Sequence, residues 1–284
     1  MTILVTGATG HLGRLVIDSL INRGAEPRTI VAGARDTSKA ADLAERGVTV
    51  SALDYAAPAT IASSLEGVDT VLLISGSEVG QRTAQHQAVI DAAVAAGVSK
   101  FVYTSLAHAD TSELPLAPEH KATEEAIAAS GLPAVILRNN WYTENYAADI
   151  ARAAETGVVT SSAGDGRIAS ATRADFAEAA AVVLLEDGHI GQVYELSGDT
   201  SWTFDDFAAA ASEITGRPVV YQPLTTQEQS AALEAAGVDA GTIGFVTALE
   251  AGIRDGALAD ADGTMARLIG RPTTPLVAGL RPLV

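Results

Sequence analysis

The chain has 284 residues and no cysteine, and its 18 Lys and Arg against 35 Asp and Glu give a formal net charge of −17. A chain of this length buries roughly three quarters of the surface that its unfolded form exposes, which is enough for one large core and a smaller appended lobe. The acidic excess argues against nucleic acid as a partner, because that binding depends on cationic side chains. The lack of cysteine excludes disulfides, thiolate metal ligands and a thiol nucleophile.

The apolar runs are short. The longest, such as residues 179–185, fall far below the roughly 20 residues that a membrane span needs. The N-terminus has no basic stretch followed by an apolar one, so no secretory signal is predicted. We therefore expect a soluble cytoplasmic protein with no membrane span, and an oligomer stays open.

Apolar, β-rich runs alternate with helical patterns through the first half of the chain. The predicted strands are residues 2–6, 28–34, 48–53, 70–75, 101–105 and 134–138. The predicted helices between them are residues 12–23, 38–46, 83–96 and 119–130. Continuously apolar strands alternating with helices are typical of a parallel sheet covered on both faces. The sequence thus predicts an α/β fold, a doubly wound parallel sheet of the Rossmann type.

The later part of the chain has a different pattern. A helix at 175–186 and a strand at 193–197 are expected to rejoin the sheet. From Trp202 onward the pattern is mostly helical, with one strand at 218–222. The predicted helices there are residues 204–215, 226–236, 241–254 and 263–269.

These patterns predict two interwoven parts. A nucleotide-binding core is expected at residues 1–138, completed by about 171–198. Residues 139–170 and 199–284 are expected to form a smaller, mostly helical lobe that holds the substrate.

A glycine pattern follows the first predicted strand and opens the first helix. Gly7 permits a tight turn, Gly10 lets the backbone approach a pyrophosphate, and Gly13 allows the helix to pack closely on the strand. A diphosphate would bind the free N–H groups at the helix N-terminus. The candidate loop comprises Gly7, Ala8, Thr9, Gly10, His11, Leu12 and Gly13. This placement predicts a dinucleotide site.

The end of the second strand decides between NAD and NADP, because the adenosine ribose lies there. Arg35 is the first side chain past that strand and has the fork that suits a 2′-phosphate. Lys39 is a weaker second cation. Asp36 either serves a ribose or caps the helix that follows. We favour NADP(H), with a solvated surface Arg35 as the alternative.

Further strand ends are expected to line the same cleft. Asp54 and Tyr55 would flank the adenine, and Ser75, Gly76 and Ser77 would run beside the ribose and nicotinamide. Asn139, Asn140, Trp141 and Tyr142 would face the nicotinamide. For Trp141 and Tyr142, plain packing under the small lobe is the alternative.

The acid–base pair of ketone reductases is missing. Such enzymes place a lysine four residues after a tyrosine, and Lys39, Lys100 and Lys121 all fail this spacing. Ketone reduction creates an alkoxide whose conjugate acid has a pKa near 16, so it needs a positioned acid. A reduced quinone is phenolate-like, with a pKa of order 10, and water can protonate it. The missing pair favours an acceptor that is already electrophilic, such as a quinone or a cationic dye.

His120 stands where the Tyr-x-x-x-Lys helix would begin. It is expected to bond the nicotinamide ribose or to relay a proton near neutral pH, with a surface histidine as the alternative. Arg173 and Asp175 are expected to form a structural ion pair and helix cap, with a direct substrate role as the alternative. The remaining histidines have no metal-ligand spacing, so no metal site is predicted.

With these residues assembled, the chain resembles the atypical short-chain dehydrogenase/reductases of the NmrA-like group, and within it the bacterial NADPH-dependent quinone oxidoreductases that use neither flavin nor zinc. The resemblance runs from end to end. It rests on residues 6–13, Arg35, Asp54-Tyr55, ISGSEVGQR at 74–82, YTSLAHADTS at 103–112, Glu119-His120, LRNNWYTENY at 137–146, AGDGRIASATRAD at 163–175 and LIGRPTT at 268–274.

The resemblance implies that the glycine loop, Arg35, residues 75–77 and residues 139–144 surround NADPH, which adds Thr143 and Glu144 to the candidate site. Two positions depart from the expected pattern, Gly76 in place of a serine and Asn140 in place of a glycine, and both would border the nicotinamide.

The implied reaction is direct hydride transfer from NADPH to a quinone or similar flat electrophile. Asn140, Tyr142 and His120 are the candidate catalytic residues, with Ser105 as a further polar contact. The alternatives are a triphenylmethane or azo dye reductase, and a non-catalytic NADP(H) sensor.

Overall fold

The computed structural model describes residues 1–284, which divide into two compact units. Unit 1 comprises Met1–Asp110, Pro118–Asn139 and Arg173–Glu195. Unit 2 comprises Thr111–Ala117, Asn140–Thr172 and Leu196–Val284. That unit 2 holds the substrate stays a prediction.

Unit 1 is built on a seven-stranded sheet with the order β3-β2-β1-β4-β5-β6-β8. The strands are Ile3–Val5 (β1), Ile30–Ala34 (β2), Thr49–Ala52 (β3), Thr70–Leu73 (β4), Lys100–Leu106 (β5), Ala134–Asn139 (β6) and Val193–Leu196 (β8). The pairs from β3 to β6 are parallel, and Leu4 of β1 lies between Val31 and Val71. The strand order reverses beside β1, so a ligand site is expected beyond the carboxyl ends of β1 and β4.

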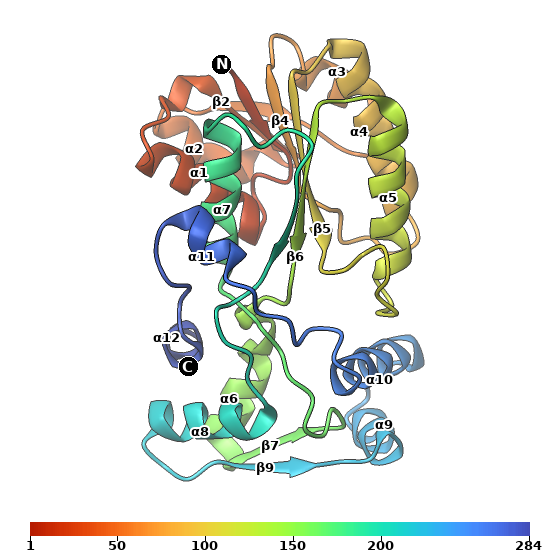
Figure 1. Cartoon of the computed structure of the whole chain (residues 1–284), viewed down its shortest axis with the longest axis vertical. Coiled ribbons are helices and arrows are strands. Elements are labelled where there is room, and N and C mark those ends of the chain that lie inside the picture. The colour runs from red at the N-terminus through yellow and green to blue at the C-terminus, as the bar shows by residue number, and fades with distance from the viewer. The chain divides into compact units, whose positions relative to one another are not determined.

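Helices cover both faces of this sheet (Figure 1). They are His11–Asn22 (α1), Ala41–Glu45 (α2), Pro58–Ser64 (α3), Arg82–Ala96 (α4), Ala117–Ser130 (α5) and Arg173–Leu185 (α7). The helix α1 packs against α7 on one face and α3 packs against α4 on the other. The predicted doubly wound Rossmann-type sheet is confirmed.

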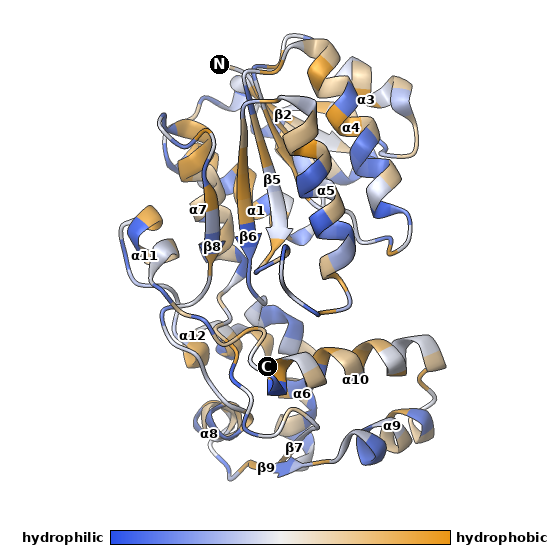
Figure 2. Cartoon of the chain, turned by 45° about the vertical axis from the view of Figure 1, so that its right-hand side comes forward, coloured by the Kyte–Doolittle hydropathy of each residue, from blue (hydrophilic) through white to orange (hydrophobic).

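Apolar strands and amphipathic helices explain this layering. Fully buried Leu4, Val71 and Phe101 of the sheet join Ile90 of α4 and Ile127 of α5 in one cluster. In Figure 2, β2 and β6 are coloured mostly as apolar, whereas α5 alternates between hydrophilic and hydrophobic residues. Burial of such side chains is the main favourable term in folding.

Some local predictions are wrong in detail. The start of the second predicted strand is instead a 3-10 turn, Pro27–Thr29. The predicted helix at 38–46 begins as a second 3-10 turn, Thr37–Ala40, because the Asp36 side chain accepts a hydrogen bond from Ser38 N and caps it. The helix α3 was not predicted, although Pro58 stands at its first turn, where proline is favoured.

Unit 2 is mostly helical. Its helices are Ala147–Thr156 (α6), Phe204–Thr215 (α8), Thr226–Ala235 (α9), Ala240–Arg254 (α10), Thr264–Ile269 (α11) and Leu276–Leu280 (α12), with 3-10 turns at Thr143–Tyr146 and Arg281–Leu283. The strands Val158–Ser161 (β7) and Val220–Pro223 (β9) pair in parallel, and β7 was not predicted. An aromatic cluster of Tyr146, Trp202, Phe204 and Phe207 forms its centre. No helix in either unit combines the length and the apolar character that a membrane crossing requires.

Candidate functional site

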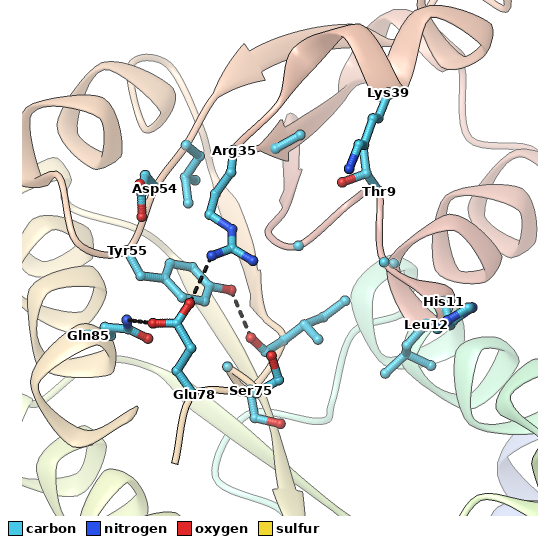
Figure 3. A pocket seen from close by; sticks show the side chains of 18 residues that line it. Thr9, His11, Leu12, Arg35, Lys39, Asp54, Tyr55, Ser75, Glu78 and Gln85 are labelled. Atoms are coloured by element: carbon cyan, nitrogen blue, oxygen red, sulfur yellow. Dashed lines mark hydrogen bonds and ion pairs between the residues drawn. The ribbon is translucent and has the colours of Figure 1, made fainter. Parts of the chain in front are cut away.

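A cavity of about 410 Å³ opens in unit 1 beyond the carboxyl ends of β1, β2, β3 and β4 (Figure 3). It brings together the predicted residues Gly7, Thr9, Gly10, His11, Leu12, Gly13, Arg35, Asp54, Tyr55, Ser75, Gly76 and Ser77. It also includes Lys39, the predicted second cation, together with Ala34, Leu53, Ile74, Glu78 and Gln85. Residues from four strand ends thus meet at the point where the strand order reverses, which is where a ligand is expected to bind.

The glycine loop forms one wall. Gly7 follows β1 with φ +57°, a conformation that side chains disfavour, and its carbonyl accepts a 2.9 Å hydrogen bond from Gly10 N. A Cβ on Gly13 would lie 2.8 Å from Ala8 Cα and closer still to the Gly7 carbonyl. Ala8 is fully buried behind the cavity, and its N–H donates to Gly33 O on β2. The loop is therefore packed from behind and has room only for glycine at Gly13.

The N-terminus of α1 supplies the hydrogen-bond donors of this wall. Gly10 is the N-cap and offers no side chain to satisfy them. The first N–H groups of a helix, here on His11, Leu12 and Gly13, have no acceptor within the helix. Together with the positive end of the helix dipole they form an anion site. The wall suits a diphosphate.

The opposite side of the cavity carries charged side chains. Arg35 lies 67% exposed just past β2, and its Nη1 is 2.8 Å from Glu78 Oε1. Glu78 Oε2 accepts a 2.9 Å hydrogen bond from Gln85 Nε2 (Figure 3). Asp36 does not line the cavity: it caps the 3-10 turn, and hydrogen bonds from Ser38 lower the pKa of its carboxyl. Of the two roles considered for Asp36, capping is the one that the structure shows.

Tyr55 ties three strand ends together. Its hydroxyl lies 2.5 Å from Thr6 Oγ1 and 2.8 Å from Ile74 O, so the ends of β3, β1 and β4 share one contact. Burial raises the pKa of the phenol, so it stays protonated as a donor. The neighbouring Asp54 accepts a 3.0 Å hydrogen bond from Ala56 N. These contacts fix the floor of the cavity.

The loop after β4 is held by buried groups that the sequence analysis missed. Gly76 N donates to His86 Nε2 at 3.0 Å, and Arg82 Nε donates to Gly76 O at 2.8 Å. Arg82 also pairs with Glu119 at 3.1 Å. Burial lowers the pKa of His86 to about 3, so the ring stays neutral and accepts from Gly76. Arg82 lies inside the ISGSEVGQR motif, but its partners are distant in sequence, so only the fold reveals them.

His120 is not the surface histidine of the second interpretation. It is 5% exposed, and its Nδ1 lies 2.8 Å from the Tyr103 hydroxyl. Burial first, and then the charge of Arg82, lowers the pKa of the ring to about 3. His120 is therefore neutral at neutral pH, which does not suit a proton relay there. It does not line the cavity, and its catalytic role stays a prediction.

The remaining predicted residues do not line this cavity either. Ser105 donates a 2.5 Å hydrogen bond to Glu124, which is paired with Arg138. Asn139 ends β6, and its carbonyl accepts from Ala107 N. The other five, Asn140, Trp141, Tyr142, Thr143 and Glu144, belong to unit 2.

Those five residues open the part of the chain that enters unit 2. Asn140 accepts a 2.6 Å hydrogen bond from the Trp141 N–H through its own side chain. Tyr142 bridges to Ala171, and Thr143 Oγ1 lies 2.9 Å from Ser170 Oγ. Their roles toward cofactor and substrate stay predictions.

Unit 2 contains its own cavity of about 330 Å³, between α6, α8, α9 and α10. Trp141, Tyr146 and Phe204 line it together with Asp149 and Glu250. The buried Tyr146 hydroxyl has no hydrogen-bond partner. Burial raises the pKa of Asp149, and the charge of Glu250 adds to this. The structure has no group of three or more His, Asp or Glu side chains placed to hold a metal ion.

A parallel sheet whose strand order reverses beside β1, with a glycine loop and an anion site at a helix N-terminus, is the fold of a Rossmann-type dinucleotide-binding protein. The model of the NmrA-like family matches residues 1–239. The chain belongs to the NmrA-like family.

Quinone oxidoreductase 2 of Escherichia coli (strain K12) is 48% identical over 281 residues, which cover 99% of this chain and 98% of that protein. The crystal structure of an NADPH-dependent quinone oxidoreductase from Escherichia coli, complexed with NADPH, matches with a TM-score of 0.95 at 48% identity and covers 99% of both chains. Citrobacter sp. triphenylmethane reductase complexed with NADP(H) matches with a TM-score of 0.94 at 37% identity over 100% of both chains.

Proposed function

We propose that this protein is an NADPH-dependent quinone oxidoreductase that transfers hydride directly from the nicotinamide to a quinone, without flavin or metal. The observation that carries the proposal is the 48% identity to Escherichia coli quinone oxidoreductase 2 over almost the whole of both chains. The Escherichia coli quinone oxidoreductase complexed with NADPH matches this fold over 99% of both chains, which supports the same cofactor for this protein.

The residues of the unit 1 cavity fit NADPH. When bound there, NADPH supplies the hydride. The turn at Gly7 and the N–H groups of His11 to Gly13 bind its diphosphate, because glycine leaves the backbone open to it. Arg35 and Lys39 line the end of the cavity next to β2 and provide positive charge for a 2′-phosphate. Asp54 and Tyr55 flank the adenosine.

The two lysines outside the cavity, Lys100 and Lys121, bind backbone carbonyls. Lys100 Nζ donates to the carbonyls of Val183, Leu184 and Glu186 at the end of α7. Lys121 Nζ donates to Asp110 O at 3.3 Å. Neither is placed beside a tyrosine hydroxyl as in ketone reductases. The acceptor must therefore be electrophilic enough to take hydride without a dedicated acid, which favours a quinone.

The substrate contacts are part of the proposal. Asn139, Asn140, Trp141 and Tyr142 shape the slot for the quinone, so acceleration comes mainly from proximity and orientation. At neutral pH His120 acts as a neutral ring, because burial lowers its pKa to about 3. The cytoplasmic location remains a prediction.

The test is anaerobic turnover. Purified protein is mixed with NADPH and benzoquinone, and the loss of the reduced-nicotinamide absorbance is followed against a blank without protein. We expect protein-dependent oxidation of NADPH with stoichiometric hydroquinone and no added flavin. NADPH binding without turnover of any quinone or dye would contradict the proposal and favour a sensor.

A dye reductase is the second candidate, favoured by the 37% identity to Citrobacter sp. triphenylmethane reductase over the whole chain. The same assay with a cationic triphenylmethane dye separates the two. Faster decolorisation of the dye than reduction of the quinone would favour this candidate.

A further inference from the structure

The carboxylate of Glu78 lies against the cation that the proposed function assigns to the 2′-phosphate. Its Oε1 is 2.8 Å from Arg35 Nη1, across the cavity from the end of β2 to the loop after β4. Figure 3 shows the guanidinium turned toward this carboxylate. The Glu78 carboxylate and the 2′-phosphate of NADPH are therefore two negative groups that would compete for the Arg35 guanidinium.

Glu78 is held in place by the loop that carries it. Two residues before it, Gly76 is fixed by His86 on its N–H and by Arg82 on its carbonyl. Two residues after it, Gly80 N donates to Glu119 Oε1 at 2.9 Å. The segment 76–80 is thus hydrogen-bonded to α4 at its start and to α5 at its end, and Glu78 lies between these contacts.

The orientation of the side chain is fixed as well. While Oε1 contacts Arg35, Oε2 accepts a 2.9 Å hydrogen bond from Gln85 Nε2 on α4. Both carboxylate oxygens are therefore engaged, Oε1 by Arg35 and Oε2 by Gln85. An Arg–carboxylate contact of this kind is charge-assisted and directional.

We propose that Glu78 is a specificity-determining residue that weakens NADPH selectively, because it competes with the 2′-phosphate for Arg35. NADH has no 2′-phosphate and does not need Arg35, so Glu78 leaves its binding unchanged. The inference rests on the proposed function, since it assumes that this cavity binds the cofactor. Glu78 thereby sets how strongly the protein prefers NADPH over NADH.

The size of the effect follows from exposure. Arg35 is 67% and Glu78 48% exposed, and exposed ion pairs are weak. Removing the carboxylate charge is expected to tighten NADPH binding about two- to fivefold.

The test compares Glu78→Gln with wild type by calorimetric titration of NADPH and NADH. Adenosine 2′,5′-bisphosphate and adenosine 5′-monophosphate, which lack the nicotinamide, isolate the adenosine end. We expect Glu78→Gln to tighten NADPH and the bisphosphate by the same factor and to leave NADH and the monophosphate unchanged. Glu66→Gln, an exposed residue with the same change of net charge, is the matched control and is expected to change none of them.

A double-mutant cycle tests the mechanism. If Glu78 acts through Arg35, then Glu78→Gln changes the ratio of NADPH to NADH affinity much less in an Arg35→Ala background than in wild type. If Glu78→Gln changed the ratio of NADPH to NADH affinity equally in wild type and in Arg35→Ala, competition for Arg35 would be overturned. Direct repulsion between Glu78 and the phosphate would then be indicated.

Other outcomes overturn the inference while sparing the proposed function. Weaker binding of both cofactors in Glu78→Gln would mean that the carboxylate contacts the shared adenosine, and an unchanged ratio would mean that Glu78 has no influence. If wild type binds neither cofactor, the proposed function fails and the inference fails with it.

Discussion

The cavities of the two units differ in how their buried polar groups are satisfied. Behind the cavity of unit 1, the hydroxyl of Tyr55 and the ring of His86 have hydrogen-bond partners at 2.5–3.0 Å. In unit 2, the Tyr146 hydroxyl has none, and burial, with the charge of Glu250, raises the pKa of the neighbouring Asp149.

This difference has energetic consequences. Buried groups with partners fix the loops that carry them, whereas a buried group without one costs free energy. The partnered groups of the unit 1 cavity are therefore expected to be intolerant of change, whereas the unpartnered Tyr146 hydroxyl of unit 2 can be removed at little cost.

The glycine loop is the least tolerant point. Gly13→Ala places a Cβ 2.8 Å from Ala8 Cα and against the Gly7 carbonyl, both backbone atoms that cannot yield. We expect a loss of about 1–3 kcal/mol in the free energy of unfolding and at least about tenfold weaker NADPH binding. Urea denaturation and calorimetric titration measure the two effects.

The matched control is Gly244→Ala in α10 of unit 2, where nothing lies within 4 Å of the new Cβ. Alanine is expected to stabilise this exposed helical position by about 0.5–1 kcal/mol. Equal effects of the two substitutions would contradict the contrast between rigid and tolerant regions.

The buried histidines of unit 1 make stability depend on pH. The pKa of His86 and that of His120 fall from 6.5 to about 3 on folding, mainly because burial disfavours the charged ring. The unfolded chain therefore binds more protons between these values. Stability is complete above pH 6.5 and is lost as the pH falls through that window. Between about pH 7 and pH 5 the loss is about 2 kcal/mol for each histidine.

Urea denaturation at the two pH values checks this expectation. His120→Gln is expected to remove about half of the histidine-dependent loss, because glutamine does not titrate. Tyr103→Phe removes the hydroxyl partner of His120 and keeps both rings, so it retains the pH dependence. A slope unaffected by His120→Gln would show that the ring gains no proton on unfolding.

The Arg35 side chain in the unit 1 cavity is expected to set the preference for NADPH over NADH. Arg35→Ala is expected to weaken NADPH binding about tenfold and to leave NADH nearly unchanged, because only NADPH has a phosphate for the guanidinium. Arg28→Ala, at an arginine that is 81% exposed and outside the cavity, is the control. Equal losses for both cofactors in fluorescence titrations would exclude a 2′-phosphate role for Arg35.

The glycine loop of the site could be predicted well from the sequence. Gly7, Gly10 and Gly13 are close in sequence, and the strand before them and the helix after them are short-range patterns. Residues at strand ends, such as Arg35 and Tyr55, follow once a parallel sheet is predicted, because their strands end at one edge.

The rest depends on contacts between distant segments. The tie between Arg82 and Glu119 joins residues 37 apart in sequence, so no local pattern discloses it. The position of His120 at a helix start leaves a surface residue open as one of two interpretations, yet its neighbour Tyr103 comes from another element and the ring is buried. The cavity of unit 2 is lined from Trp141 to Ile253 by side chains on several helices, which leave no motif.

The smallest effect comes from two buried tyrosines that differ in their partners. Tyr55→Phe removes a hydroxyl that lies within 2.8 Å of two acceptors, and we expect a loss of about 1 kcal/mol in the free energy of unfolding. Tyr146→Phe removes a hydroxyl that has no partner, so the change is expected to be neutral or to stabilise by up to about 1 kcal/mol. Both substitutions keep the ring and its packing, so the difference between them isolates the hydroxyl. Equal losses in urea denaturation would mean that the Tyr146 hydroxyl is satisfied in solution, and the contrast between the two units would then fail at this residue.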